Sequence, residues 1–248
     1  MSPAPGELRV SAVAGLPEFT QGMRVGEEIA ARAELVDGDV VVISQKIVSK
    51  AEGRVRKLSA VLPGAKARKL AAALGKEPAL VQLILDESKE VLRAERNVLI
   101  VETHHGFVCA NAGIDSSNLP DPETVCLLPV DPDASARAIR REISPGVGVV
   151  IADSFGRAWR LGQAEVAIGC AGLEPLADWR GRQDASGREL EATLIAIADQ
   201  AAGAADLVRD KASGVPAAIV RGLAPHITAD DGPGAAALLR RHEDDLFR

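Results

Sequence analysis

Three stretches of this sequence place polar and charged side chains directly after an apolar run of strand length. The most polar of them is DSFGRAWRLGQ, residues 153–163, which follows GVGVVIA. A sheet holds its strands rigidly and presents reactive groups on the segments that follow them. The three stretches are therefore where we look for the chemistry of this protein.

The stretch that begins at Asp153 combines metal-binding and cationic side chains. An aspartate carboxylate beside the Ser154 hydroxyl is a ligand set for a divalent cation next to phosphates. Neighbouring side chains diverge in an ideal strand, so we expect the strand to end and turn here, bringing both side chains to one cation or to two neighbouring ones. Arg157 and Arg160 would then neutralise charge on a transferred group. The alternative is a β-turn at Phe155-Gly156 with both arginines in solvent.

The other two stretches offer cations and hard oxygen ligands. SQKIVSKAEGR follows VVVI and supplies Gln45, Lys46 and Lys50, of which the lysines would pair with phosphate oxygens as point charges. Its alternative reading is a solvated helix start with surface lysines. CANAGIDSSN combines small residues, which let a backbone approach a ligand, with the oxygens of Asp115 and Asn118. Its alternative reading is an Asx-type turn with a helix cap.

Other motifs of catalysis are missing from the sequence. It contains no P-loop, no Rossmann glycine fingerprint, no nucleophile elbow and no H-E-x-x-H. His104 and His105 are adjacent, and adjacent strand residues face opposite sides, so we do not expect them to chelate one metal. The cysteines at positions 109, 126 and 170 form no C-x-x-C, which favours small buried thiols in a reducing compartment.

Composition narrows the classes of partner. The chain has 248 residues, of which 47% are hydrophobic, enough for a buried core. A net charge of −6, 4 Phe, 2 Trp and no Tyr argue against a nucleic-acid partner, because phosphate backbones are repelled and stacking surfaces are scarce. A single nucleotide held with metal ions fits, since metals bring positive charge. The N-terminus has no signal-peptide pattern and no apolar run could span a bilayer, so we expect a cytoplasmic protein without a membrane partner.

Hydrophobic periodicity predicts helices and strands in mixed order, which favours an α+β fold over a doubly wound parallel sheet. We expect one domain over residues 1–248, with a possible division into two lobes near residue 120. Strands are predicted at 40–44, 97–103, 106–110, 125–130, 147–154 and 216–222. Helices are predicted at 25–35, 78–95, 133–143 with Asp133 as N-cap, 194–210 and 232–247.

Together and in this order, SQKIVSKAEGR, HHGFVCANAGIDSSN and DSFGRAWRLGQAEVAIG resemble the coenzyme F420:L-glutamate ligase family. That family is known as CofE in archaea and forms the N-terminal half of FbiB in actinobacteria. The resemblance extends from GLPEF near the start to VPAAIVRG and DDLF near the end. It implies a CofE-like fold that forms an intertwined homodimer. This chain would be either a stand-alone ligase or a domain of a longer protein.

The resemblance also implies roles for individual residues. Asp115 and Asp153 resemble carboxylate metal ligands, Ser154 resembles a ligand to a second metal, and Arg157 and Arg160 complete the catalytic set. LPEF stands where the family more often has Pro-Leu-Ile-Lys, and Leu161 stands where Asn is common. The implied nucleotide contacts are Leu16, Pro17, Gln45, Lys46, Lys50, Asn118, Asp210 and Lys211, with Asp210 at the place of a metal-binding glutamine.

The activity implied by the resemblance is GTP-dependent amide ligation. The amine of L-glutamate would join a carboxylate on the phospholactyl tail of a deazaflavin, coenzyme F420-0 or its dehydro form, through an acyl phosphate, and further rounds would add γ-linked glutamates. Two divalent ions, Mg²⁺ or Mn²⁺, would assist, with K⁺ as a further candidate ion. Two alternatives stay open: a metal-dependent nucleotide phosphohydrolase or phosphotransferase, and a non-catalytic module that binds deazaflavin or nucleotide.

Overall fold

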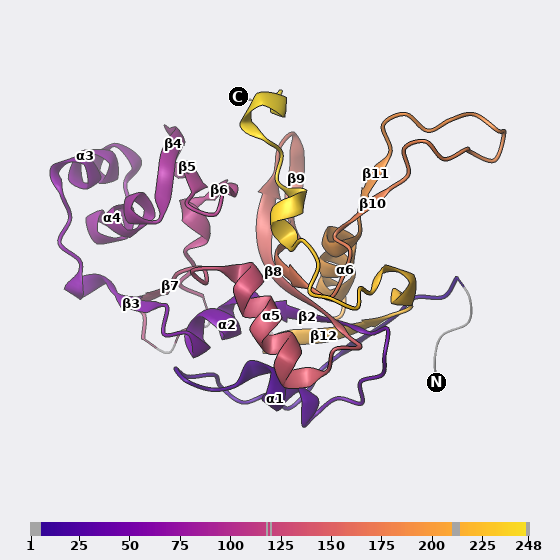
Figure 1. Ribbon diagram of the computed structural model, residues 1–248. Helices are drawn as coiled ribbons and strands as arrows, with labels where there is room; N and C mark the ends of the chain where they lie inside the picture. The colour runs from indigo at the N-terminus through magenta and orange to yellow at the C-terminus, as the bar shows by residue number, and fades with distance from the viewer. Residues whose placement is uncertain (1–5, 118, 120, 210–213, 247–248) are drawn as a thin grey trace.

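A five-stranded sheet forms the centre of the protein in a computed structural model that describes residues 6–117, 119, 121–209 and 214–246 (Figure 1). Strands β2 and β8 run parallel, and the other neighbouring pairs of this sheet are antiparallel. The spatial order is β1 (Arg9–Ala12), β12 (Ala217–Arg221), β2 (Val40–Ser44), β8 (Gly148–Arg157) and β9 (Arg160–Ala171).

Helices bury both faces of this sheet, as the continuous apolar run VVVIS predicts. Along β2, Val41 and Ile43 point into one apolar cluster, whereas Val40 and Val42 point into the other. Helix α6 (Ile197–Asp206) covers the second face with its alanines. The first face is covered by α1 (Val25–Ala30), α2 (Gln45–Ala51) and α5 (Pro132–Ile143).

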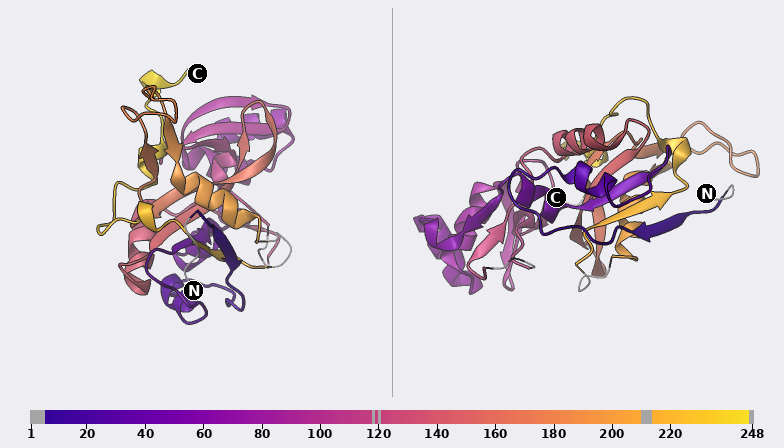
Figure 2. Two further views of the ribbon diagram at one scale, coloured as in Figure 1. Left: turned by 90° about the vertical axis from the view of Figure 1, so that its right-hand side faces the viewer. Right: turned by 90° about the horizontal axis from the view of Figure 1, so that it is seen from below.

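A smaller lobe lies beside the sheet and has an apolar cluster of its own (Figures 1 and 2). The two-stranded ladder of β3 (Val55–Lys57) and β7 (Thr124–Cys126) lies where the chain leaves for the lobe and returns. The single-domain assignment with a division near residue 120 stays a prediction. The lobe contains η1 (Leu58–Ala60), α3 (Ala65–Leu74), α4 (Pro78–Asp86), β4 (Ser88–Glu95), β5 (Val98–Thr103), β6 (Val108–Ala110) and η2 (Asn111–Gly113).

The predicted helix over residues 78–95 is wrong in its second half. The helix ends at Asp86, and β4 then pairs antiparallel with β5. Arg96 and Asn97 both have positive φ, 51° and 62°, and form the two-residue connection between these strands. This is the backbone geometry of a tight hairpin turn, so strand pairing outweighs the helical preference of SKEVLRAE.

Three other helix predictions also need correction. The helix predicted at 25–35 ends at Ala30, and residues 194–196 form strand β11 (Leu194–Ala196) ahead of α6. The N-cap of α5 is Asp131, whose Oδ1 accepts a hydrogen bond from the Ala134 amide at 2.9 Å. Asp133 instead accepts hydrogen bonds from the amides of Cys170 and Ala235, and so joins α5 to two distant segments.

The closing helix predicted at 232–247 is absent from the part of it that the structure describes. Short 3₁₀ turns stand there, η4 (Ala235–Leu238) and η5 (His242–Asp244), with a further turn, η3 (Ala224–His226), earlier in the chain. Leu238 packs against the apolar cluster on the face of the sheet that α6 covers. Leu239 packs against the apolar cluster on the opposite face. The segment therefore crosses between two clusters, which suits a broken path better than a regular helix.

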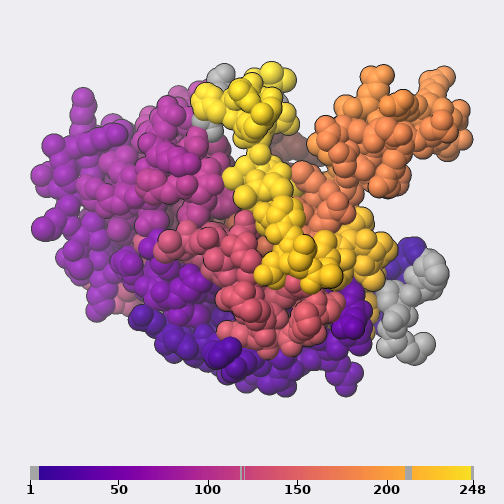
Figure 3. All heavy atoms as spheres, in the orientation of Figure 1, coloured from indigo at the N-terminus to yellow at the C-terminus, as the bar shows by residue number. Residues whose placement is uncertain are grey.

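Two hairpins extend from the sheet. Strand β8 does not end at Asp153: it continues to Arg157, and the chain turns at Ala158 and Trp159 rather than at Phe155-Gly156. Continued pairing with β9 is the reason, because Asp153 lies opposite Val166 in the same ladder. The second hairpin, which we call the arm, consists of β10 (Leu176–Asp178), residues 179–193 and β11, and it projects away from the body (Figure 3).

Candidate functional site

A pocket lies where the parallel strand β2 ends, against the side of the β8–β9 hairpin. The edge beyond the carboxyl ends of parallel strands is a common place for ligands in sheets covered by helices. Five stretches of the chain that are distant in sequence contribute to its wall. The lining residues are Pro17, Glu18, Phe19, Ser44, Gln45, Lys46, Ile47, Lys50, Asp115, Ser117, Asp153, Ser154, Glu165, Asp206, Arg209, Gly214, Val215 and Pro216.

One wall of the pocket holds an ion pair between Lys46 and Asp115. Lys46 Nζ lies 2.8 Å from Asp115 Oδ2 and also donates to the Ser117 carbonyl and hydroxyl, at 2.9 and 2.7 Å. The Ser117 amide donates to Asp115 Oδ1 at 2.7 Å. Burial disfavours the charged carboxylate, but these hydrogen bonds outweigh burial and hold the pKa of Asp115 below its ordinary value. Asp115 is therefore ionised and ready to bind a cation at neutral pH.

Asp153 has the opposite electrostatic setting. Burial, followed by the negative charge of Glu165, raises its pKa from 3.8 to about 7. The charge of Asp115 adds to the rise, whereas Lys46 and the Ser154 amide oppose it. Two carboxylates thus stand close enough to Asp153 to disfavour its ionisation. A bound cation would relieve this repulsion, so the donor set fits a divalent metal.

A buried ion pair supports the far side of the pocket. Arg209 Nη2 lies 2.9 Å from Glu165 Oε2, and both side chains are less than a tenth exposed. The other oxygen of this carboxylate accepts a hydrogen bond from Ser154 Oγ at 2.7 Å. This hydrogen bond orients the Ser154 hydroxyl toward Glu165 at the wall of the pocket. Among the residues that the structure describes, none is a hydrogen-bond partner of the buried Arg209 Nε, which marks a locally unfavourable arrangement.

Lys50 also meets a carboxylate in this pocket. Its ammonium lies 2.5 Å from Glu18 Oε1, which belongs to the loop ahead of α1. Lys50 itself is buried, in contrast to the predicted alternative of a surface lysine. Gln45 is also buried, and its Oε1 accepts a hydrogen bond from Ser49 Oγ at 2.9 Å. Helix α2 therefore presents its cations inward.

The structure brings most of the predicted site residues together. Leu16 packs against an apolar cluster and is not part of the lining. Arg157 and Arg160 lie on the exposed end of the β8–β9 hairpin, also outside the lining. Asn118, Asp210 and Lys211 lie outside the described residues. The predicted residues in the lining are Pro17, Gln45, Lys46, Lys50, Asp115, Asp153 and Ser154.

Sequence reasoning missed Glu165, Arg209 and Glu18. A signal for Glu165 was available, because GQAEVAIG places one acid at the entry to a run that is otherwise buried. Strand pairing then sets Glu165 directly opposite Ser154. Arg209 and Glu18 had no comparable local signal, since each meets its partner from a separate segment.

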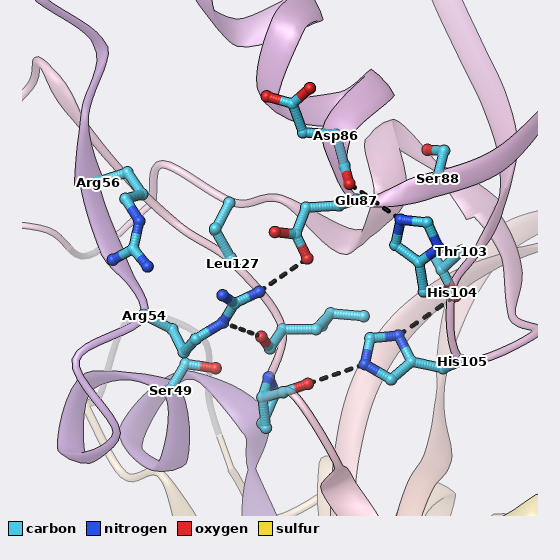
Figure 4. A network of polar contacts seen from close by, with 12 residues as sticks. Ser49, Arg54, Arg56, Asp86, Glu87, Ser88, Thr103, His104, His105 and Leu127 are labelled. Carbon is cyan, nitrogen blue, oxygen red and sulfur yellow. Dashed lines mark hydrogen bonds and ion pairs between the residues drawn. The ribbon is translucent and has the colours of Figure 1, made fainter. Parts of the chain in front are cut away.

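The two histidines contact backbone carbonyls, His104 within the lobe and His105 between the lobe and the segment after β7 (Figure 4). His104 Nε2 lies 2.9 Å from the Asp86 carbonyl oxygen, and His105 Nε2 lies 2.9 Å from that of Pro129. Beside them, Arg54 Nη2 donates to Glu87 Oε2 at 2.7 Å. Within the described residues, no group of three or more His, Cys, Asp or Glu side chains is arranged to hold a metal by itself.

The cysteines are unsuited to nucleophilic chemistry. Cys109, Cys126 and Cys170 are all buried, as predicted. Burial raises the pKa of all three thiols, to about 12 for Cys109 and Cys170, with further contributions from Asp153 and Asp133 respectively.

No described helix is long and apolar enough to cross a membrane.

The fold and the pocket define a mixed α+β protein whose site alternates carboxylates with cations, an arrangement suited to phosphate-bearing ligands and divalent ions. The chain belongs to the F420-0:gamma-glutamyl ligase family, whose sequence model matches residues 15–222. It is 46% identical over 220 residues to the coenzyme F420:L-glutamate ligase of Methanothermobacter thermautotrophicus, covering 87% of this chain and 86% of the relative. The ligase of the same name from Methanopyrus kandleri is 43% identical over 247 residues, 97% of this chain and 98% of the relative. That of Methanocaldococcus jannaschii is 42% identical over 239 residues, 94% of each.

Proposed function

We propose that this protein is a coenzyme F420:L-glutamate ligase, which adds L-glutamate to coenzyme F420-0. The observation that carries the proposal is the convergence of Asp115, Asp153 and Ser154 with Lys46 and Lys50 on one pocket, within a chain of this family. Relatives that bear this name align over nearly the whole chain.

The reaction explains why such a pocket is needed. A carboxylate condenses with an amine in water only after one of its oxygens becomes a leaving group. Transfer of the γ-phosphoryl group of GTP to the acceptor carboxylate forms an acyl phosphate and releases GDP. The glutamate amine then attacks the acyl carbon, inorganic phosphate leaves, and the amine loses a proton. Lys46 and Lys50 line the pocket and would neutralise phosphate charge.

Divalent ions fit the carboxylate side of the pocket. Asp115 and Asp153 would hold two such ions, Mg²⁺ or Mn²⁺, with Ser154 as a further oxygen ligand to the second. When bound, these ions neutralise charge that spreads over the transferring phosphoryl group. Glu165 accepts a hydrogen bond from Ser154 Oγ and so fixes the position of this hydroxyl at the wall of the pocket. K⁺ has no assigned ligand set, and the roles of Arg157 and Arg160 toward the transferred phosphate stay predictions.

The ion pairs within the pocket couple metal and nucleotide binding. Lys46 and Lys50 are each paired with a carboxylate, Asp115 and Glu18. A cation that takes Asp115 releases Lys46 for a phosphate oxygen, and a phosphate that takes Lys46 releases Asp115 for a cation. Each ligand therefore removes an ion pair with which the other would compete, and we expect the two to bind cooperatively.

We also propose that the protein is a homodimer, as the family resemblance implies. The arm extends well away from the body, a shape that a second copy would cover (Figure 1). Light scattering across micromolar concentrations tests the assembly, and a fully active monomer would refute it. A cytoplasmic location and the absence of nucleic-acid and membrane partners stay predictions.

Mass spectrometry of the deazaflavin tests the proposed function. Incubation of the protein with F420-0, GTP, Mg²⁺ or Mn²⁺ and L-glutamate should add glutamate residues to the acceptor, with one phosphate released for each. Omission of glutamate or of the acceptor should stop sustained phosphate release. Brisk release without glutamate would favour the phosphohydrolase, whereas ligand binding with no turnover would favour the non-catalytic module.

A further inference from the structure

The pocket supplies charge but very little aromatic surface. Among its lining residues Phe19 alone is aromatic, and it is 2% exposed. The acceptor in the proposed function is a deazaflavin, whose flat tricyclic ring favours an aromatic stacking partner. The whole chain has 4 Phe, 2 Trp and no Tyr, so few residues can meet this need. The ring must find its partner outside the pocket lining.

The end of the β8–β9 hairpin, residues 157–161, carries exposed apolar side chains beyond the pocket lining. Trp159 is 79% exposed and Leu161 is 98% exposed. Figure 1 shows this hairpin projecting from the sheet. The same hairpin supplies Asp153 and Ser154 to the pocket at its base, so its end and the pocket share one rigid element.

The backbone of this turn is strained where the tryptophan stands. Trp159 has a φ of +58°, in the left-handed region that favours glycine and is unusual for a bulky residue. Glycine would relieve the strain at this position. Strained residues of this kind gather at ligand-binding sites, where the side chain rather than the backbone is required. The positive φ at a bulky, exposed residue therefore directs attention to the side chain of Trp159.

Two cations face each other beside the tryptophan. Arg157 and Arg160 are cross-strand partners in the hairpin, and like charges directly opposite each other are destabilising. Arg157 Nη2 donates to the Leu161 carbonyl at 2.7 Å, which ties one of the two guanidinium groups to the start of β9. An anionic ligand would relieve this repulsion, and the acceptor, with its phosphodiester and carboxylate, is anionic.

The distance between hairpin end and pocket suits the acceptor. Trp159 lies six residues beyond Asp153, which is about 20 Å along an extended strand. From the acceptor's carboxyl carbon, ten bonds lead through the lactyl, phosphodiester and ribityl groups to the ring, about 12 Å when extended. The width of the ring and the side chains at both ends cover the remainder. Phe155, only two residues from Asp153, is too close for an extended acceptor.

We propose that residues 157–161 form the subsite for the aromatic ring of the acceptor. Trp159 stacks on the ring, Leu161 covers its edge, and Arg157 with Arg160 attract the anionic acceptor. The acceptor carboxylate then lies at the base of the hairpin, beside Asp153 and Ser154. This inference rests on the proposed function, because it takes the deazaflavin as the acceptor.

The second tryptophan provides a matched control. Trp179 lies at the start of the arm, is 39% exposed, and is covered by the Arg182 guanidinium at 5.1 Å from the ring centroid. Trp159→Ala should raise KM for F420-0 about tenfold, as expected for the loss of one stacked aromatic, while KM for GTP stays unchanged. Trp159→Phe should recover much of the loss. Trp179→Ala should leave both KM values unchanged.

A ringless acceptor separates stacking from a general defect. Ligation of glutamate to a phospholactyl compound without the deazaflavin should be slow in the wild type and equally slow in Trp159→Ala. Equal changes in the KM for F420-0 in Trp159→Ala and Trp179→Ala would overturn the subsite. So would a raised KM for GTP or a changed oligomeric mass in Trp159→Ala.

Direct binding distinguishes failure of the subsite from failure of the proposed function. Calorimetry with F420-0 alone, without GTP or glutamate, should show weaker binding in Trp159→Ala and unchanged binding in Trp179→Ala. This pattern in a protein that never ligates glutamate would support the subsite and reject the ligase. Ligation with equal F420-0 affinities in both variants and the wild type would support the ligase and reject the subsite.

Discussion

Lys50 and Glu18 form an ion pair at 2.5 Å in which the lysine is 9% exposed and the glutamate 70% exposed. Glu18 belongs to LPEF, where the family resemblance leads one to expect a lysine three residues after the proline. A cation of the pocket is thus held by an acid that reaches in from a surface loop. The exposed partner can leave easily, because exposed ion pairs are weak.

Glu18→Gln should therefore strengthen nucleotide binding. The variant removes the carboxylate that competes with phosphate for Lys50, and we expect the Kd for GTP to fall by about two- to fivefold, in line with a surface ion pair. Lys50→Ala should raise the Kd while leaving the free energy of unfolding within about 1 kcal/mol. Calorimetry measures both affinities. In a Lys50→Ala background the Glu18→Gln change should have no effect, and an undiminished gain there would contradict the competition.

Asp115 and Asp153 should act as one unit in catalysis. Asp115→Asn or Asp153→Asn keeps size and hydrogen bonding but removes the charge that a divalent cation needs, so either change should lower ligation by orders of magnitude. The double variant should lose little more, because residues that serve one assembly are non-additive. Product mass and phosphate release measure all three variants. Partial rescue of Asp153→Asn at high metal concentration is expected, and additive losses would assign the two carboxylates independent roles.

Local patterns predicted the parts of this site that follow strands. The run VVVI and the polar residues after it predicted β2 and cations near its end, but left open whether the lysines of α2 face solvent or, as the structure has them, the pocket. The small residues around Asp115 predicted a close approach of the backbone to a ligand. The convergence of Asp115 and Asp153 on one pocket was predictable, because each acid follows its own apolar run. The end of β8 was not predictable. Pairing with β9 extends β8 beyond polar residues of the kind that normally terminate a strand.

The remaining contacts depend on tertiary packing. Arg209 meets Glu165 across 44 positions of sequence, and no local pattern specifies such a partner. Strand β4 was missed for a related reason. SKEVLRAE favours a helix in isolation, and only pairing with β5 and the turn at Arg96 and Asn97 makes it a strand.

The Arg209–Glu165 pair should contribute strongly to stability. Arg209→Leu leaves Glu165 charged and buried without its partner, so the free energy of unfolding should fall by about 3–5 kcal/mol. Glu165→Gln in the same background removes the orphaned charge and should recover much of that loss. Urea unfolding measures each variant and the double. A loss below about 1 kcal/mol in Arg209→Leu would show that solvent reaches the pair.

Asp153→Asn should stabilise the metal-free protein at neutral and alkaline pH. The folded pKa of Asp153, about 7, lies above the ordinary value of 3.8, so the folded state holds a proton that the unfolded state releases between those values. Stability contributed by this group is therefore complete below about pH 4 and is lost as pH rises toward 7. The variant should gain on the order of 2–4 kcal/mol at pH 8 and nothing at pH 4.

Thermal unfolding in a chelating buffer measures this difference. The Tm of Asp153→Asn should exceed that of the wild type by several degrees at pH 8, and the two should coincide near pH 4. Mn²⁺ at pH 8 should raise the Tm of the wild type, because it binds the ionised folded state, and should raise that of the variant much less.

Asp199→Asn is the control: burial also raises the pKa of Asp199, which accepts a hydrogen bond from the Ala167 amide away from the pocket lining. Mn²⁺ should raise the Tm of Asp199→Asn by the same amount as it raises the Tm of the wild type. Equal Mn²⁺ responses in Asp153→Asn and the wild type would place the metal elsewhere.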